Sequence, residues 1–379
     1  MSTRDISELF NVRSHNPSFF AVQQAVASPR QLLDFCIPVN LHFPPPEMLK
    51  LVHDNLRDIL RYYPDYAMVH QQHLEQITGL PADTIVPCNG STEIITRLCQ
   101  TAKTPIVTDV PTFSRWTDLP EELGAPLHLI HRRQENRFHL DAHEIAQFVR
   151  QVDAATLVIS NPNNPTGAWM THREVEELLA LLTDLDAVVI DESFIDFSDV
   201  DSAGFDVLRH PNLIVVKSLG KSLGWHGVRL GYAVAAPARA ESLRNSLAFW
   251  NVNGLAAYVL KTVTEFKERY RSSFLQAAMD REYMRAKLRM ISGIVVYPSK
   301  ANFLYVELPP LISGTQLRDR LLVKHGIMVR ECSNKIGSSE QNLRLAVQTN
   351  HAVDVLVAAL SEELELMSVP FCAPAKWDK

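Results

Sequence analysis

Residues 155–167 read ATLVISNPNNPTG: an apolar run passes directly into a loop rich in asparagine and proline. Three other short runs nearby in the chain are apolar and rich in β-branched residues: Pro105–Asp109, Ala187–Asp191 and Leu213–Lys217. Runs that are apolar along their whole length predict strands buried on both faces, as in a parallel sheet. Between two of them, His172–Leu182 has apolar residues at helical spacing. This alternation of strand and helix predicts a doubly wound α/β domain.

The pattern changes towards both ends of the chain. Val252–Met290 predicts a long, charged connecting helix, and residues 294–367 predict short strands and two helices. We therefore expect a large α/β domain over residues 40–260. Residues 1–39 and 261–379 would together form a smaller α+β domain.

The composition is that of an ordinary globular protein, with 379 residues of which 46% are hydrophobic and 21% are charged. The net charge of −6 lacks the basic excess that is typical of nucleic-acid-binding proteins. No apolar run reaches the ~18 residues that span a bilayer, and the charged N-terminus does not resemble a signal peptide. Five widely spaced cysteines argue against a disulfide framework or a zinc site. We expect a cytoplasmic protein that binds no nucleic acid, membrane or metal.

Two polar segments have the character of ligand sites. Asn89–Glu93 precedes a helical pattern, and free N–H groups at a helix start bind anions, although a plain N-cap from Ser91 or Thr92 explains the same residues. The loop at residues 160–167 follows a buried strand, and ligands of open α/β sheets bind at the carboxyl ends of the strands. A tight Asn-Pro turn is the alternative for this loop, but a string of eight such residues favours a ligand site.

Two further segments carry charged groups at the ends of predicted strands. Asp191 ends an apolar run, where a partly buried carboxylate either meets a cation or caps a helix. Ser218, Lys221 and Arg229 bring a hydroxyl, an amine and a guanidinium into one loop-and-strand unit. The Gly-Lys-Ser triplet there is not a P-loop, because Val215 stands where that motif requires glycine. A solvated surface lysine remains the alternative for Lys221.

Together these four segments resemble the fold-type I pyridoxal 5′-phosphate (PLP) enzymes of aminotransferase class I/II, and the resemblance covers nearly the whole chain. It implies a large PLP-binding domain with a mostly parallel mixed sheet between helices. It also implies that Lys221 forms a Schiff base with PLP, and that its pKa is lowered beside the cationic ring. Asp191 would pair with the pyridinium nitrogen, so that the ring accepts electrons from the substrate. Asn164 would bond to the phenolic oxygen of the ring.

The same resemblance assigns the remaining cofactor contacts. Ser218, Arg229 and the turn Gly90-Ser91-Thr92 would bind the PLP phosphate through charge-assisted hydrogen bonds. Phe113 would stack on the ring. Tyr63 would reach the phosphate of the cofactor in the neighbouring subunit, which implies a homodimer with shared active sites.

Within the family, the chain most resembles L-threonine O-3-phosphate decarboxylases and, next, histidinol-phosphate aminotransferases. Phe194 stands where the aminotransferases usually have a tyrosine that bonds to the cofactor. Arg330 matches an arginine that binds the substrate phosphate, and Arg344 matches one that binds the α-carboxylate. Two such arginines can bind the two anionic ends of one small molecule. The alternative is that one of them makes a structural salt bridge.

Two segments depart from the decarboxylase pattern and leave the substrate open. Residues 13–17 replace a His-Gly-Gly-Asn motif, and residues 38–43 replace an Asn-x-Asn-Pro-x-Gly motif. Both motifs line the substrate side in relatives, and Asn40 is the expected substrate contact in the second. The substrate is therefore expected to be a phosphate- or phosphonate-bearing amino acid of open identity. His226 is unusual for the family and either faces the site or is a loop histidine without a role.

Three functions compete at this point. Decarboxylation and transamination differ in which bond of the substrate α-carbon stands perpendicular to the cofactor ring, and the sequence does not fix that orientation. Phe194 favours a decarboxylase over an aminotransferase that passes the amino group to 2-oxoglutarate. The third alternative is a non-catalytic binding protein, which the presence of both Lys221 and Asp191 disfavours.

Overall fold

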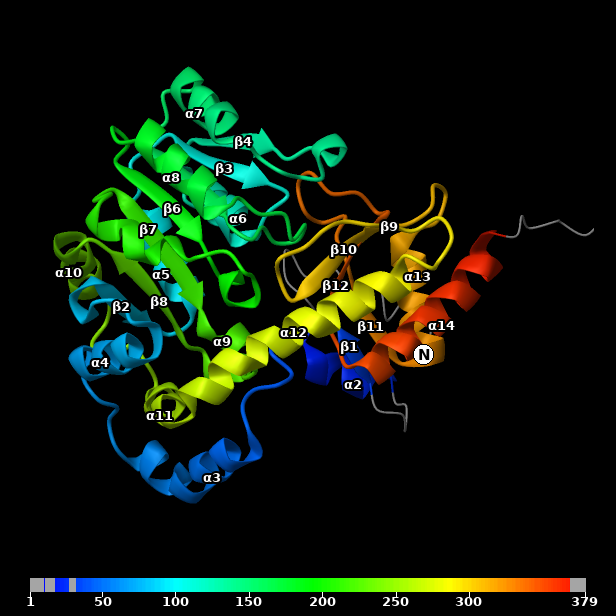
Figure 1. The fold of residues 1–379 in the computed structure, drawn as a ribbon, viewed down its shortest axis with the longest axis horizontal. Coiled ribbons are helices and arrows are strands. Elements are labelled where there is room, and N and C mark those ends of the chain that lie inside the picture. Colours follow the sequence, from blue (N-terminus) through cyan, green and yellow to red (C-terminus); the bar gives the residue numbers. More distant parts are fainter. Residues whose placement is uncertain (1–9, 11–17, 27–31, 369–379) are drawn as a thin grey trace, which may run out of the picture.

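The structure is a computed structural model, which describes residue 10, residues 18–26 and residues 32–368. Two sheets with helices packed against them lie next to one another (Figure 1). The larger sheet comes from the cyan and green part of the chain, and the smaller one mainly from the orange part. The first strand of the described chain joins the smaller sheet beside strands from the C-terminal third. The mixed α/β architecture predicted from the sequence is confirmed.

Seven strands form the larger sheet: β2 (Ile85–Cys88), β3 (Ile106–Val110), β4 (Leu127–His131), β5 (Thr156–Ser160), β6 (Ala187–Asp191), β7 (Leu213–Ser218) and β8 (Gly231–Ala235). Their order is β2-β8-β7-β6-β5-β3-β4. The run from β4 to β7 is parallel, and β8 is antiparallel to both of its neighbours, so the sheet is mixed and mostly parallel. Each of the four strands predicted in this region agrees with the structure to within one residue.

Helices pack on both faces of the larger sheet. Neighbouring strand residues enter different cores: Val188 and Ile190 join one, and Val189 joins the other. Because both faces are buried, the central strands are apolar at most positions, which is why the sequence shows them so clearly. The first core is covered by α3 (Pro46–Arg61), α4 (Ala67–Thr78), α7 (Ala142–Gln151), α8 (His172–Leu181) and α11 (Gly254–Val263). The second is covered by α5 (Ser91–Thr101), α6 (Arg115–Glu122) and α10 (Pro237–Asn245).

Five strands form the smaller sheet: β1 (Leu33–Phe35), β9 (Val295–Val296), β10 (Phe303–Glu307), β11 (Ile327–Glu331) and β12 (Asn342–Ala346). Their order is β1-β11-β12-β10-β9, with β1 parallel to β11 and the other pairs antiparallel. β1 has no counterpart in the sequence prediction, because three residues are too few to show a period. The helices of this region include α2 (Phe19–Val26), α13 (Gly314–Arg320) and α14 (Asn350–Ser368).

The prediction of one long helix over residues 252–290 was wrong. The structure has α11 followed by α12 (Lys267–Leu288), with a 3-10 turn at Thr264–Phe266 between them. The turn contains no glycine or proline, so the sequence carries no signal for the break.

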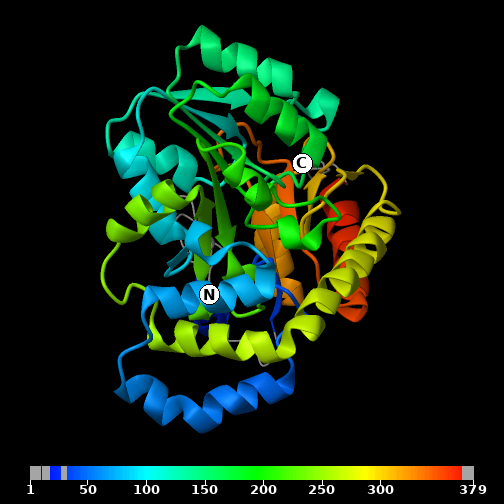
Figure 2. The same cartoon turned by 60° about the vertical axis from the view of Figure 1, so that its left-hand side comes forward.

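Helix α12 connects the two parts of the fold. Near its start Tyr270 packs into the core of the larger sheet, whereas Met284 and Leu288 pack into the core of the smaller sheet. Figure 2 shows this helix in yellow, running from beneath the larger sheet to the red helix α14. At 22 residues α12 is the longest helix described. Neither it nor any other helix in the described part of the chain has the length and apolar character needed to cross a membrane.

One face of the smaller sheet is directed at the larger one. Tyr305, Arg344 and Arg330 are direct partners across β10, β12 and β11, so their side chains share a face. Alternate residues such as Leu343 and Leu345 enter the core on the opposite face. Tyr305 packs against Phe138, from the loop after β4, with ring centroids 5.4 Å apart. The two arginines are therefore on the side that meets the larger sheet.

Candidate active site

A cavity of about 550 Å³ lies where the carboxyl ends of the parallel strands meet the smaller sheet. It brings together residues that the sequence predicts as site residues from both parts of the fold. Those that line it are Ser91, Thr92, Phe113, Asn164, Ser218, Lys221, Arg229 and Arg344. Phe194 and His226 line it too. A smaller cavity shares Lys221, Asn164 and Phe113 with it and adds Asp191.

Lys221 lies on α9 (Leu219–Ser222), the short helix that directly follows β7. Its Nζ is 4.8 Å from the centre of the Phe194 ring. The pKa of Lys221 is lowered to about 8, mainly by burial. The charge of Asp191 acts to raise this pKa, and the charges of Arg344 and Arg229 act to lower it. At pH 7 about a tenth of such amines are neutral, far more than of an ordinary lysine. The side chain is therefore suited to act as a nucleophile.

The backbone of Lys221 is fixed by a buried network that includes Asn40. The Asn40 N–H donates to the Lys221 carbonyl at 2.8 Å. Its side-chain amide donates to the Ser222 carbonyl at 2.9 Å and to Ser273 Oγ at 2.7 Å. Tyr270 donates to the Ser222 hydroxyl at 2.7 Å. Asn40 is not among the residues that line the cavity, so its described contacts support the lysine and differ from the expected contact with substrate.

Asp191 is a buried carboxylate at the end of β6. Its Oδ2 accepts a hydrogen bond from Trp116 Nε1 at 2.8 Å, and its Oδ1 accepts one from the Ser193 N–H at 3.0 Å. Neither partner is charged, and no ion pair involves Asp191 in the described part of the chain. A buried carboxylate with neutral partners favours the approach of a cation.

A cluster of hydrogen-bond donors surrounds the start of α5. No side chain caps this helix, so its first N–H groups have no side-chain partner, and Ser91 and Thr92 line the cavity. Gly90 has φ 79°, and a Cβ there would lie 2.5 Å from Arg229 Nη2. The absence of a side chain at Gly90 thus lets the guanidinium approach the helix start. This combination of helix N-terminus and arginine fits an anion.

The carboxylate nearest in sequence to this cluster is engaged by other donors. Glu93 Oε2 accepts hydrogen bonds from the Asn89 N–H at 2.7 Å and from Asn251 Nδ2 at 2.8 Å. The donors of the helix start and Arg229 therefore keep an uncompensated positive character. With an amine, a buried carboxylate and the Phe113 ring around the same cavity, the donor set fits a phosphorylated, aldehyde-bearing pyridine such as PLP.

Asn164 and Arg344 meet across the boundary between the two sheets. Arg344 Nη1 donates to Asn164 Oδ1 at 2.8 Å, and Nη2 donates to the Cys36 carbonyl at 2.6 Å. The buried Nε has no hydrogen-bond partner among the described residues. The pKa of Arg344 is lowered to about 10, mainly by burial and also by the charge of Arg330. Since Arg344 forms no salt bridge in the described part of the chain, the alternative of a structural ion pair does not hold for it.

Asn161 and Asn163 hold the loop that carries Asn164. Asn161 exchanges hydrogen bonds with the backbone of Met170, at 2.9 and 3.2 Å. Asn163 Nδ2 donates to Asp109 Oδ2 at 2.8 Å, and Asp109 forms a buried ion pair with Arg132 at 2.6 Å. These bonds fix a loop whose third asparagine lines the cavity.

Other predicted residues lie outside the cavity lining. Arg330 is directly opposite Arg344 and donates to Asn334 Oδ1 at 2.8 Å. Tyr63 is 81% exposed and stacks on Trp250 with ring centroids 4.7 Å apart. Residues 13–17 lie outside the described part of the chain.

His226, which the sequence left as either a residue facing the site or a loop histidine without a role, lines the cavity. The pKa of His226 is lowered to about 3, mainly by burial and also by the charges of Lys221 and Arg229. The imidazole is thus neutral at neutral pH and offers a proton acceptor.

The sequence does not reveal two residues of this region, Trp116, which donates to Asp191, and Lys335. A lone tryptophan or lysine carries no motif that would have indicated either of them.

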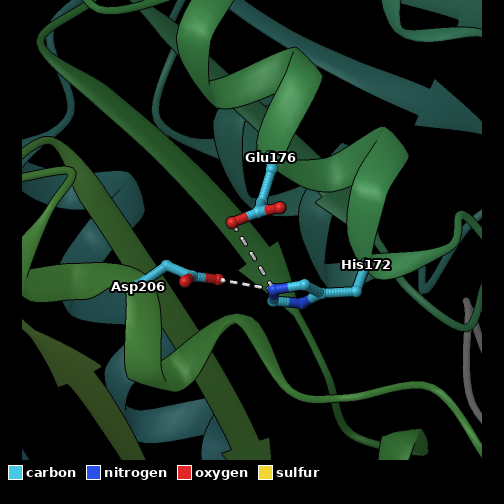
Figure 3. A group of neighbouring side chains, drawn as sticks. All are labelled: His172, Glu176 and Asp206. Atoms are coloured by element: carbon cyan, nitrogen blue, oxygen red, sulfur yellow. Dashed lines mark ion pairs between the residues drawn. The ribbon is translucent and has the colours of Figure 1, made fainter.

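A second polar cluster contains no residue of the cavity lining. Figure 3 shows the imidazole of His172 directed at the carboxylates of Glu176 and Asp206. His172 Nε2 is 3.8 Å from Glu176 Oε1 and 3.5 Å from Asp206 Oδ2. Arg209 pairs with both carboxylates, 2.8 Å from Glu176 Oε1 and in direct contact with Asp206. Because Arg209 pairs with both carboxylates, we interpret the cluster as a tie between α8 and the 3-10 turn Ala203–Leu208.

Comparisons with known proteins match nearly the whole chain. The family described as aminotransferase class I and II matches residues 31–360. The L-serine phosphate decarboxylase of Sulfurospirillum multivorans is 30% identical over 376 residues, which is 94% of each chain. The histidinol-phosphate aminotransferase of Thermococcus kodakarensis is 29% identical over 77% of this chain and 82% of that one. The solved structure of a decarboxylase from Sulfurospirillum multivorans has a TM-score of 0.85, 29% identity and 96% coverage of both chains.

Proposed function

Because the chain belongs to the aminotransferase class I and II family, we propose that it releases carbon dioxide from a small amino acid that carries a phosphate or phosphonate group. It is an enzyme, and PLP is its cofactor. The similarity to a protein named L-serine phosphate decarboxylase supports a phosphorylated amino acid as substrate. The observation that carries the proposal is the pair Arg330 and Arg344, which are buried, directly opposite one another and paired with no carboxylate in the described residues.

We assign the residues around the cavity to the two ends of the cofactor. Bound PLP supplies an electron sink for the pair of electrons released at the substrate α-carbon. Arg229, Ser218 and the turn Gly90-Ser91-Thr92 would bind its phosphate. Asp191 would hold a proton on the pyridine nitrogen, and the fixed donors from Trp116 and Ser193 keep that carboxylate in place. Phe113 would cover the ring, and Asn164 Nδ2 would donate to the phenolic oxygen.

Lys221 would act twice in the reaction. As a neutral amine it holds the cofactor covalently, which its pKa of about 8 permits at physiological pH. In the chemical step the bond between the α-carbon and the carboxylate breaks, and carbon dioxide leaves. A proton from the Lys221 ammonium group then joins the α-carbon. The product is an amine that keeps the phosphate.

The substrate would be held by its two anionic ends. Arg344 would bind the α-carboxylate and Arg330 the phosphate, each through charge-assisted hydrogen bonds. Phe194 offers no hydroxyl next to Lys221, so Asn164 would bond to the phenolic oxygen without help from a phenol at that position. This difference from the aminotransferases favours the decarboxylase. The similarity to histidinol-phosphate aminotransferases keeps transamination to 2-oxoglutarate as the second candidate.

We also propose that the enzyme is a homodimer of the cytoplasm. Tyr63, Tyr66, Phe249 and Trp250 form an exposed aromatic cluster, in which Phe249 is 91% exposed. Such a patch is typical of a protein interface. A second copy that covers it would allow Tyr63 to reach the neighbouring cofactor phosphate. Buried thiols at Cys88, Cys99 and Cys332 are consistent with a reducing compartment.

A substrate panel separates the two candidate reactions. The PLP-loaded enzyme is incubated with L-phosphoserine, L-phosphothreonine and histidinol phosphate in the absence of any keto acid. We expect carbon dioxide release, with one amine formed per carbon dioxide, from a phosphorylated amino acid. Accumulation of pyridoxamine phosphate that 2-oxoglutarate reverses would instead identify an aminotransferase.

A further inference from the structure

Lys335 is a buried lysine in the turn that follows β11. Its Nζ donates to the Thr112 carbonyl at 3.0 Å and to Ser114 Oγ at 3.1 Å. These two acceptors flank Phe113, which lines the cavity. An ammonium group has three donors, and no ion pair involves Lys335 in the described part of the chain. The lysine thus brings a positive charge from the smaller sheet to the segment beside the candidate ring position.

Lys335 adds to the charge of the two arginines. The pKa of Lys335 is lowered to about 7, mainly by burial and also by the charges of Arg330 and Arg344. Cys332, on the same turn, and Asp118, on α6, act in the opposite direction. Mutual repulsion among buried cations is unfavourable until an anion compensates it.

Asp118 forms no ion pair with Lys335 in the described part of the chain. The two acidic residues that interact electrostatically with the arginines do not supply the compensation either. The Asp34 carboxylate accepts hydrogen bonds from the N–H groups of Cys36 and Ile37, at 2.7 and 3.2 Å. The Glu331 carboxylate accepts from the backbone and the hydroxyl of Ser333, at 2.5 and 2.9 Å. Both are engaged locally and make no ion pair with the three cations.

This inference rests on the proposed function and names the substrate class more narrowly. We propose that Lys335 is a specificity-determining residue, which completes a three-cation site with Arg330 and Arg344 and selects amino acids with a dianionic phosphate or phosphonate. A carboxylate and a phosphate dianion together carry three negative charges and match three cations. Histidinol phosphate lacks the carboxylate and leaves one cation unmatched. A sulfonate carries one charge fewer than a phosphonate of the same shape.

The matched ligands for the test are L-2-amino-3-phosphonopropanoate and L-cysteate. They share a carbon skeleton and a tetrahedral end group, and neither end group is a ready leaving group. Binding is measured on PLP enzyme that has been reduced with borohydride, which fixes the cofactor and prevents turnover of the ligand. Titration calorimetry at pH 7.5 in buffers of different ionisation enthalpy also gives the protons taken up. The variants are Lys335→Gln, Lys335→Arg and, as a control for loss of one lysine charge, Lys103→Gln. Lys103 is exposed and pairs with Asp186.

We expect the wild type to bind the phosphonate more tightly than the sulfonate. Lys335→Gln should weaken phosphonate binding about 10- to 100-fold, as for loss of a hydrogen bond to a charged group, with a much smaller effect on cysteate. Lys335→Arg should keep the preference, and Lys103→Gln should leave it unchanged. Because the pKa of Lys335 is about 7, phosphonate binding should draw up to about three quarters of a proton more per site into the wild type than into Lys335→Gln. The ionisation of the phosphonate itself cancels in this difference.

Equal loss of affinity for both ligands in Lys335→Gln, or no loss, would overturn the proposal. If Lys335→Gln does not fold, as judged by cofactor absorbance and thermal unfolding, the wild type still decides. Equal proton uptake for the two ligands, once the ionisation of each ligand itself is subtracted, contradicts a role for Lys335. The two hypotheses fail separately. An enzyme that releases no carbon dioxide from any phosphorylated amino acid refutes the proposed function, whereas the binding contrast refutes or supports Lys335 alone.

Discussion

Arg344 donates a hydrogen bond of 2.8 Å to the side-chain oxygen of Asn164, across the boundary between the two sheets. This bond fixes the orientation of the Asn164 amide, because its oxygen is taken and its nitrogen remains to donate. It also sets the guanidinium beside the cavity while leaving the buried Nε without a partner. A residue expected to contact the cofactor and one expected to contact the substrate are thus directly coupled.

Replacing Asn164 with aspartate should convert this bond into a salt bridge that competes with the substrate carboxylate. We expect KM for the amino acid to rise about tenfold or more in Asn164→Asp, since a hydrogen bond to a charged group contributes about 1.5–3 kcal/mol. Steady-state kinetics measures the effect. Asn136→Asp, at an exposed position after β4, is the control for an added charge. An unchanged KM in Asn164→Asp would show that Arg344 does not bind the carboxylate.

The reactivity of Lys221 should depend on pH with a midpoint near 8. The pKa of Lys221 is lowered to about 8, mainly by burial. The charge of Asp191 acts to raise it, and that of Arg344 acts to lower it. The neutral amine grows as pH rises through the pKa. Arg344→Gln should therefore move the midpoint to higher pH, and Asp191→Asn should move it to lower pH. Competitive acetylation of cofactor-free enzyme, quantified on the Lys221 peptide, measures all three. A midpoint near 10, or shifts of the opposite sign, would contradict the electrostatic account.

Trp116 should be important for the function of Asp191. Trp116→Phe keeps an aromatic ring but removes the 2.8 Å bond to Asp191 Oδ2. We expect a fall of about 10- to 100-fold in kcat, from the loss of one hydrogen bond to a charged group. Trp116 also lines a separate cavity of about 430 Å³, so thermal unfolding is measured in parallel to separate stability from chemistry. Trp169→Phe is the control; if both variants keep full kcat, the bond to Asp191 has no catalytic consequence.

Gly90 should be required for binding of the cofactor phosphate. A Cβ at this position would lie 2.5 Å from Arg229 Nη2, so Gly90→Ala should displace the guanidinium. We expect weaker retention of PLP, seen as a raised Kd in equilibrium dialysis. Gly79→Ala is a matched control, because Gly79 also has a positive φ, 78°, but a Cβ there would meet no atom within 4 Å. Comparable PLP affinity in the two variants would show that Arg229 does not bind the phosphate.

The fold could be predicted where burial leaves a pattern in the sequence. Strand β6 is buried at every position, and its run of apolar residues gives its bounds without error. Strand β1 pairs with β11 only through tertiary contact and is too short to show a period. The turn at Thr264–Phe266 is set by the path of α12 across the two cores, and its residues are compatible with a continuous helix.

The candidate site could be predicted only where a motif carries it. Lys221, Asp191 and Asn164 stand in recognisable strings at the ends of strands, and all three border the same small cavity. The sequence alone could not show that Asn161 and Asn163 hold the loop in place while Asn164 lines the cavity, because nothing in the sequence distinguishes the three asparagines. Asn40 supports the backbone of Lys221 through contacts with distant segments.

The central claim is that Lys221 carries the cofactor, and reduction with borohydride tests it most directly. The PLP-loaded enzyme is reduced, digested and analysed by mass spectrometry. Lys217 is the informative comparison, because it lies four residues earlier in the chain, in β7, and is buried in an ion pair with Asp196 at 2.8 Å. The account predicts a reduced phosphopyridoxyl group on Lys221 and none on Lys217. Cofactor released unreduced, or attached to any other lysine, would contradict it.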